Sequence, residues 1–218
     1  MKNIPVIKKE LLSLVKGQSG MINIIFALCF GVIAVPSGFL LSFIVMPVMF
    51  GMSAYSSLNL DESSGWMSYL LSTPIGRKHF VRQKYVATIL FAAIGIAYSA
   101  LLAVLHCLFT GNSLSNILVF IIPMGLFFGL IIPSLCFPLS LKFGVEKGKV
   151  INLGLGAILG MLMSMILSAS GDMTVLSISA KLAKYDPKLI MLAAAGASAA
   201  AVLFSWKLSA LFFRKREL

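Results

Sequence analysis

Six apolar runs, each separated from the next by polar or turn-forming residues, dominate this sequence. A helix that crosses a bilayer needs about 20 mainly apolar residues. Of the 218 residues, 59% are hydrophobic and 11% are charged, whereas an average globular protein carries roughly 25% charged residues. The pattern predicts an all-α polytopic membrane protein with six transmembrane helices, and it excludes a soluble enzyme and a nucleic-acid-binding module. The six runs cover residues 21–35, 39–58, 86–109, 117–141, 150–169 and 189–213.

Lys and Arg are unevenly divided between the two sides that six spans define. Fifteen of the 18 fall in the N-terminal segment, in the second and fourth loops, or at the C-terminal end; the other three lie in the connector before the last run. Cytoplasmic loops carry an excess of Lys and Arg. We therefore expect a multi-pass cell-membrane protein with both termini in the cytoplasm. The net charge of +11 then needs no nucleic-acid partner.

The N-terminal segment is basic and amphipathic rather than uniformly apolar. Ile7, Leu11 and Leu14 share one helical face, and most of the lysines lie off it. This pattern predicts a helix lying in the headgroup plane; a basic tail is the alternative. The chain is then one transmembrane domain, 1–218, with these parts: interfacial helix 1–18, first two spans 21–58, cytoplasmic loop 59–85, spans three to five 86–169, extracellular connector 170–188 and last span 189–213.

Ionisable residues are missing from the middle of every predicted span. Ion-coupled carriers keep such groups at bilayer depth, and an intramembrane enzyme needs a nucleophile with a base, or metal ligands. Segment 144–150 resembles a phosphate-binding loop, but Val150 stands where Ser or Thr would hold magnesium, and the spacing of its glycines is short by one residue. We expect no enzyme activity and no bound metal or cofactor in this chain, so its driving force must come from elsewhere.

Prolines and small residues predict how the spans pack. Pro47 in the second span and three prolines in the fourth predict that these helices are kinked or interrupted. Small residues recur every four positions in the last three spans, for example Gly125 and Gly129. Such stripes let helix backbones approach closely, either within the chain, at a subunit interface or along a conduit.

Bulky Phe and Met side chains follow one face of the second span and recur in the fifth. Flexible Met and flat Phe suit an adaptable apolar site, although the same face could contact lipid. The predicted substrate cavity consists of Phe39, Phe43, Met46, Phe50, Met161, Ser164, Met165 and Ser168.

The cytoplasmic loop carries the most specific pattern. Ser63 or Ser64 is predicted to cap a short helix, and Pro74 to end it, since the residue before proline disfavours helix. A basic, helical segment then leads into the third span. The short helix would expose aromatic side chains, which require a partner surface. Its predicted outer face consists of Trp66, Tyr69, Leu70 and Thr73.

Residues 62–85, which read ESSGWMSYLLSTPIGRKHFVRQKY, resemble the first cytoplasmic loop of ABC type-2 exporter permeases, where an acidic residue precedes a YLLSxPISRxxxVxxKY-like phrase. The likeness extends over the whole chain and is closest to the permeases of phenol-soluble-modulin and antimicrobial-peptide exporters. It implies a permease subunit that moves amphipathic or hydrophobic substrates, membrane-active peptides among them, out of the cell. Two such chains, identical or related, would pair with two separate ATP-binding-cassette subunits that bind ATP and Mg²⁺.

The resemblance also implies that the short helix is a coupling helix docked on the ATPase. Glu62 would pair with a basic group of the loop or partner, and Arg77, Lys78 and Arg82 would meet acidic or phosphate groups. The docking element would consist of Trp66, Tyr69, Leu70, Ser72, Thr73, Pro74 and Ile75. Two alternatives remain: a non-transporting immunity or sensor subunit, and a secondary carrier that needs no ATPase.

Overall fold

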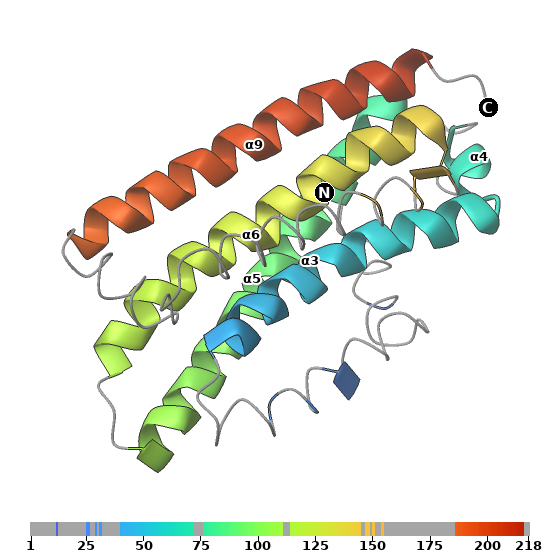
Figure 1. Cartoon of the computed structure of the whole chain (residues 1–218). Helices are drawn as coiled ribbons and strands as arrows, with labels where there is room; N and C mark the ends of the chain where they lie inside the picture. Colours follow the sequence, from blue (N-terminus) through green and yellow to red (C-terminus); the bar gives the residue numbers. More distant parts are fainter. Residues whose placement is uncertain are drawn as a thin grey trace.

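The computed structural model (Figure 1) describes residues 40–71, 76–110, 114–144 and 186–215, together with positions 12, 25, 26, 29, 31, 147, 148, 150 and 154. Within these residues the regular structure is helical, with no strand. The helices are α3 (Leu40–Ser63), α4 (Trp66–Leu71), α5 (Gly76–Thr110), α6 (Leu114–Phe143) and α9 (Pro187–Lys215). The predicted interfacial helix and the predicted first and fifth spans lie outside the described residues, apart from the isolated positions.

The four long helices lie side by side, and short α4 lies at one end of them (Figure 1). We call this end, where α3, α6 and α9 finish and α5 begins, the α4 end. α3 packs against α5 and α6, and α6 packs against α9. Among the described residues, three helical segments are long and apolar enough to cross a membrane: His79–Phe109, Ile121–Phe143 and Leu189–Phe213. The number of spans and the side on which each terminus lies stay predictions.

Helical structure reaches further than the apolar runs. α3 continues past the second run to Ser63, and α5 runs without a break from Gly76 into the third span, which confirms the helical basic segment. The prolines do not end their helices: α3 includes Pro47, and α6 includes three prolines. Interruption, one of the two predicted effects, is therefore wrong, because a proline removes one backbone hydrogen bond and neighbouring helices can satisfy the carbonyl that it leaves free. A kink at these prolines stays a prediction.

Glycines allow α3, α5 and α6 to meet closely around one proline. A Cβ atom added to Gly125 would lie 3.1 Å from Cγ of Pro47, and one added to Gly129 would lie 3.0 Å from Cβ of Pro47. On α5, a Cβ added to Gly95 would lie 2.7 Å from Cα of Pro47. Gly125 and Gly129 thus serve packing within the chain, one of the three roles considered for them. In contrast, a Cβ at Gly196 of α9 would meet nothing within 4 Å.

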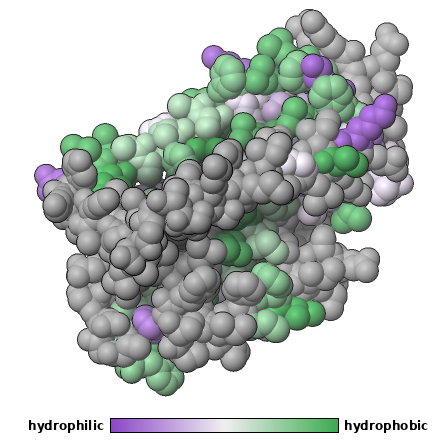
Figure 2. Space-filling view, in the orientation of Figure 1, coloured by the Kyte–Doolittle hydropathy of each residue, from purple (hydrophilic) through white to green (hydrophobic). Residues whose placement is uncertain are grey.

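The buried core extends from the middle of the helices to the α4 end. Its cluster includes Met46, Phe50 and Leu58 of α3, Phe137 of α6 and Phe213 of α9. α9 is much less buried: only 11% of the apolar stretch within Leu189–Phe213 is buried in the bundle. The apolar side chains of α9 give the upper face in Figure 2 its green colour. Such a face suits contact with lipid tails.

Candidate functional site

A glycine in the left-handed conformation separates α3 from α4. α3 ends at Ser63, and Gly65 has a φ of 70°, a conformation that costs other residues roughly 1–2 kcal/mol. The Gly65 amide donates to the carbonyl of Glu62 at 3.2 Å, and the Gly65 carbonyl accepts from the amide of Tyr69 at 3.1 Å. Gly65 therefore caps α4. The predicted capping by Ser63 or Ser64 is wrong, because α3 extends through Ser63, whose hydroxyl donates back into α3.

α4 directs one side chain into the core and presents another at the surface. Met67 is 2% exposed and belongs to the buried cluster, whereas Tyr69 is 62% exposed. Trp66 is half-buried against the cluster, and its ring centroid lies 5.5 Å from that of Tyr69. The two aromatic rings therefore share a face of the helix, as predicted. α4 is a short helix held to the bundle by Met67, with an aromatic pair at its surface.

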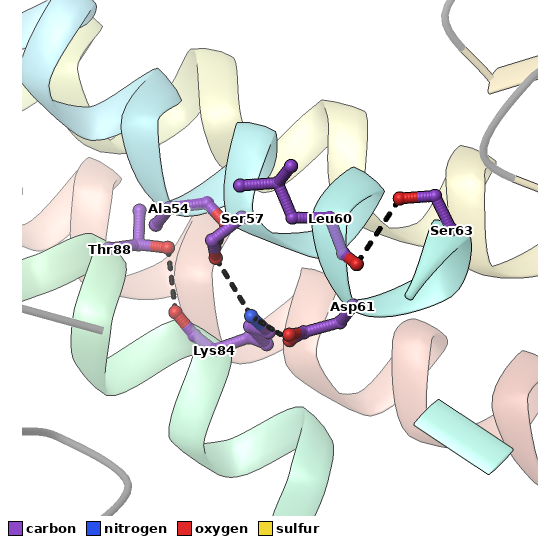
Figure 3. A network of polar contacts seen from close by, with 7 residues as sticks. All are labelled: Ala54, Ser57, Leu60, Asp61, Ser63, Lys84 and Thr88. Carbon is purple, nitrogen blue, oxygen red and sulfur yellow. Dashed lines mark hydrogen bonds and ion pairs between the residues drawn. The ribbon is translucent and has the colours of Figure 1, made fainter. Parts of the chain in front are cut away.

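A buried ion pair joins α3 to α5 close to α4 (Figure 3). Nζ of Lys84 lies 2.6 Å from Oδ2 of Asp61, and these side chains are 4% and 5% exposed. Lys84 also donates to Oγ of Ser57 at 2.8 Å, and Ser57 gives its own hydrogen to the carbonyl of Ala54. The Lys84 ammonium lies 5.7 Å from the ring centroid of Phe80. Because Asp61 is near the end of α3 and Lys84 near the start of α5, the pair closes the segment that contains α4.

Aromatic and hydroxyl groups join α5 to α9 at the same end of the bundle. The rings of Phe80 and Phe213 stack with their centroids 5.5 Å apart. The Tyr85 hydroxyl lies within hydrogen-bond distance of Oγ of Ser205 and, at 2.8 Å, of Oγ of Ser209. The C-terminal part of α9 is therefore attached to α5 by ring stacking and by directional hydrogen bonds.

A proline in α6 leaves one backbone carbonyl free, and this carbonyl accepts the hydrogen bond that joins α6 to α9. Pro138 has no amide hydrogen, so the carbonyl of Ser134, one helical turn earlier, lacks its usual partner. The Ser205 hydroxyl of α9 donates to this carbonyl. Because a hydroxyl has one hydrogen to donate, Ser205 must accept its other bond from Tyr85, and Tyr85 must then accept from Ser209.

A hydrogen bond of 3.0 Å between Ser140 and Tyr55 joins α6 back to α3. With the ion pair, these contacts connect α3 to α5, α5 to α9, α9 to α6 and α6 to α3. All the groups involved lie in the parts of their helices nearest the α4 end. We call the following hydroxyl-bearing residues the polar belt: Tyr55, Tyr85, Ser134, Ser140, Ser205 and Ser209.

Comparison with known proteins gives the class of the molecule. The family described as ABC-2 family transporter protein matches residues 6–214. The chain belongs to this family. No curated protein and no solved structure is significantly similar to it. It is thus a multi-pass membrane component of a transporter. The predicted resemblance is confirmed at the level of the family, and the narrower likeness to peptide exporters stays a prediction.

The structure describes only some of the predicted docking side chains. Trp66 and Tyr69 lie together on α4, and Glu62 is half-buried in the last turn of α3. Arg82 is exposed on α5, where it lines a shallow apolar groove between α5 and α9 that also includes Tyr85. Leu70, Arg77 and Lys78 lie in α4 and α5 with their side chains outside the described set, which also excludes Ser72, Thr73, Pro74 and Ile75.

Two of the predicted cavity residues have described side chains. Met46 is 0% exposed and Phe50 is 6% exposed, and the Phe50 ring centroid lies 6.4 Å from that of Tyr98. Both are packed within the bundle in this structure, so they would line a cavity only if these helices separated. Phe43 lies in α3 with its side chain outside the described set; Phe39, Met161, Ser164, Met165 and Ser168 also lie outside it.

Several residues of this end were not singled out from the sequence. Asp61, which precedes Glu62, supplies the carboxylate of the buried ion pair with Lys84. Lys84 was counted with the cytoplasmic charges, yet it is 3% exposed. The available signal for the Asp61–Lys84 pair was that these opposite charges lie on either side of α4 in the sequence. Met67 offered no separate signal, since an apolar residue of a short helix can face either way.

Proposed function

We propose that this chain is the permease subunit of an ATP-driven exporter, and that α4 is the coupling helix on which a separate ATPase subunit docks. The observation that carries the proposal is the construction of α4. Met67 holds the helix to the core while Tyr69 is largely exposed beside Trp66. Exposed aromatic residues of this kind are frequent anchors of protein–protein interfaces, and a helix fastened to the bundle can transfer a displacement to it.

The position of α4 supports the same assignment. It lies at the end of the bundle where α9 also finishes (Figure 1), and most of the Lys and Arg residues belong to segments that the charge rule places in the cytoplasm. An ATPase in the cytoplasm would meet α4 in this orientation. Export, two ATPase copies, and pairing with a second permease chain, identical or related, belong to this proposal.

The proposed substrates are amphipathic or hydrophobic molecules, with membrane-active peptides as the leading class. No ionisable residue lies near the middle of the predicted spans, so an ion gradient has no obvious binding group there. The exposed apolar side chains of α9 suit a molecule that reaches the transporter from the lipid. ATP and Mg²⁺ would be bound by the ATPase, and this chain would hold neither.

Tyr69→Ala tests the proposal in the full-length protein, purified with its associated subunits in a mild detergent. The copurified subunit is identified by mass spectrometry and assayed for ATP hydrolysis, and inside-out vesicles are tested for ATP-dependent uptake of a fluorescent amphipathic peptide. We expect an ATP-binding-cassette subunit with the unmodified chain, and an affinity for it lowered by about tenfold or more in the variant, the scale of a central interface aromatic.

Phe109→Ala provides a matched control, because Phe109 is 78% exposed but lies at the opposite end of α5. It should retain both the ATPase subunit and transport. Equal ATPase binding by Tyr69→Ala and the unmodified chain would exclude docking on the Tyr69 face of α4. Uptake driven by an ion gradient without ATPase would instead support a secondary carrier, and peptide binding without uptake would support an immunity or sensor subunit.

A further inference from the structure

We propose that Asp61 and Lys84 form a positioning pair, which holds α4 at a fixed place relative to α3 and α5 so that displacement of α4 by the ATPase moves the membrane-spanning helices. This inference rests on the proposed function of α4. The pair itself does not contact the ATPase in this proposal. It acts by keeping the two helices that enter and leave the α4 segment together.

The geometry restrains the Lys84 ammonium from several sides. It lies 2.6 Å from the carboxylate of Asp61, donates to Ser57 at 2.8 Å, and lies 5.7 Å from the ring centroid of Phe80. The Lys84 backbone is also engaged, since Thr88 Oγ1 donates to its carbonyl at 2.8 Å (Figure 3). Asp61 and Ser57 belong to α3, whereas Phe80 and Thr88 hold Lys84 from within α5, so the two contacts to α3 define one relative position of the two helices.

Stability alone does not account for two buried charges at this place. Removing two ions from water is costly, and replacing a buried ion pair with well-packed apolar residues is often neutral or stabilising. Apolar partners are available nearby, because Leu58 of α3 and Ala87 of α5 are both buried. An apolar contact would hold α3 and α5 together while allowing small shifts between them. The ion pair and its hydrogen bonds permit far less displacement, because their geometry is directional.

The neighbouring contacts connect the Asp61–Lys84 pair to α4 and to the other long helices. Asp61 is linked to α4 through the short turn at Gly65, and Met67 of α4 is buried in the same core cluster as Phe80. From α5, the polar belt continues to α9 and α6 through Tyr85, Ser205 and the Ser134 carbonyl. A displacement of α4 therefore moves four long helices together as long as α3 and α5 remain paired.

The double variant Asp61→Leu with Lys84→Met tests this role in the permease–ATPase complex reconstituted into liposomes. The measured quantity is the ratio of fluorescent peptide transported to ATP hydrolysed. Assembly and hydrolysis should persist, since no buried charge is left unpaired. The transport ratio should fall by about three- to tenfold, which lies within the range of coupling changes caused by residues between two sites. The exchanged pair Asp61→Lys with Lys84→Asp should recover part of the ratio.

Asp186→Leu with Lys207→Met is the matched control, because it removes one acidic and one basic charge from exposed positions. This variant should keep the original ratio of peptide transported to ATP hydrolysed.

Ser57→Ala provides a second variant in case the apolar pair does not assemble. It removes one hydrogen bond to Lys84 and should lower the transport ratio by about twofold. An unchanged ratio in the assembled apolar pair overturns the inference; if that pair does not assemble, an unchanged ratio in Ser57→Ala overturns it.

The two proposals fail in different ways. If Tyr69→Ala keeps the ATPase subunit at full affinity, the docking function of α4 is wrong. If Tyr69→Ala loses the subunit while the Asp61 and Lys84 variants transport at the original ratio, docking stands and only the positioning role is overturned.

Discussion

The two halves of the helix bundle are held together in different ways. At the α4 end, the helices are joined by the buried ion pair and by the polar belt. Towards the other end, α3 meets α5 and α6 through the close approach of glycines to Pro47. Apolar helices gain little from leaving lipid for one another, so membrane proteins use both close backbone packing and hydrogen bonds. The glycine contact sets the distance between helices, whereas the polar contacts also set their direction and register.

Lys84→Met should give the largest loss of stability, because it leaves the Asp61 carboxylate buried without its lysine. Both side chains are at most 5% exposed, so solvent screens the charge little. Breaking a buried pair by removing one partner costs about 3–5 kcal/mol. The apparent free energy of unfolding, measured by denaturant titration of the protein in detergent micelles, should fall by this amount.

The double variant of Asp61→Leu and Lys84→Met provides the comparison for that loss. It removes both charges, so its stability should be close to that of the unmodified chain. If Lys84→Met alone is as stable as the double variant, Asp61 does not bear an uncompensated charge, and the α4 end does not depend on the ion pair in the way described.

Gly95→Ala should give the next largest effect and addresses the other half of the bundle. Its Cβ would lie 2.7 Å from the backbone Cα of Pro47, so α3 or α5 must shift. Overpacking of this kind costs typically 1–3 kcal/mol. The thermal midpoint in detergent should fall, while the peptide transported per ATP should change less than it does in the Asp61 and Lys84 variants.

Gly196→Ala is the control for the same chemical change in α9, where a Cβ meets nothing within 4 Å. Alanine is a better helix former than glycine by about 1 kcal/mol, so this variant should be as stable as the original or more so. Equal losses in the two variants would show that the close contact at Pro47 is not what holds α3 to its neighbours.

The sequence predicted the helical class of the chain well because its main signals are local. Apolar runs, charge bias and the aromatic pair of α4 can be recognised without knowing which helices are neighbours. The resemblance to ABC type-2 permeases, which the contiguous residues 62–85 indicated, is confirmed at the level of the family by a match over residues 6–214. Gly125 and Gly129 were also recognised by their spacing, and the structure supplied their partner, Pro47.

The contacts of the α4 end were harder to predict because they join residues far apart in the chain. Tyr85 bonds to Ser209, and Ser205 bonds to the backbone of Ser134; no local pattern pairs these residues. Pro138 was interpreted as a possible break in its helix, whereas its effect is to free a carbonyl for α9. A proline predicts an unpartnered carbonyl, but only the packing of the helices determines which group fills it.

Tyr85→Phe should have a smaller effect than either charge removal or overpacking. It keeps the ring and removes the hydroxyl that lies between Ser205 and Ser209. Interhelical hydrogen bonds in membrane proteins contribute about 0.6 kcal/mol on average and up to about 1.7 kcal/mol, so the unfolding free energy should fall within this range. Adding Ser209→Ala to Tyr85→Phe should cost little more, because both changes remove the same bond; additive losses would contradict the proposed belt.

Gly65→Ala should have the smallest effect on the whole protein and sharpens the comparison at α4 itself. There is open space for the new methyl group, but the φ of 70° is strained for alanine, at roughly 1–2 kcal/mol before the exposed turn relaxes. The strain falls on the turn between α3 and α4, so the thermal midpoint should change little while amide exchange becomes faster in α4, most directly at Tyr69, whose amide donates to Gly65. Gly65→Asn should be milder, because asparagine tolerates the left-handed conformation better. If both variants exchange at the original rate, the turn does not fix α4, and the position of the helix must be set by Met67 and the Asp61–Lys84 pair alone.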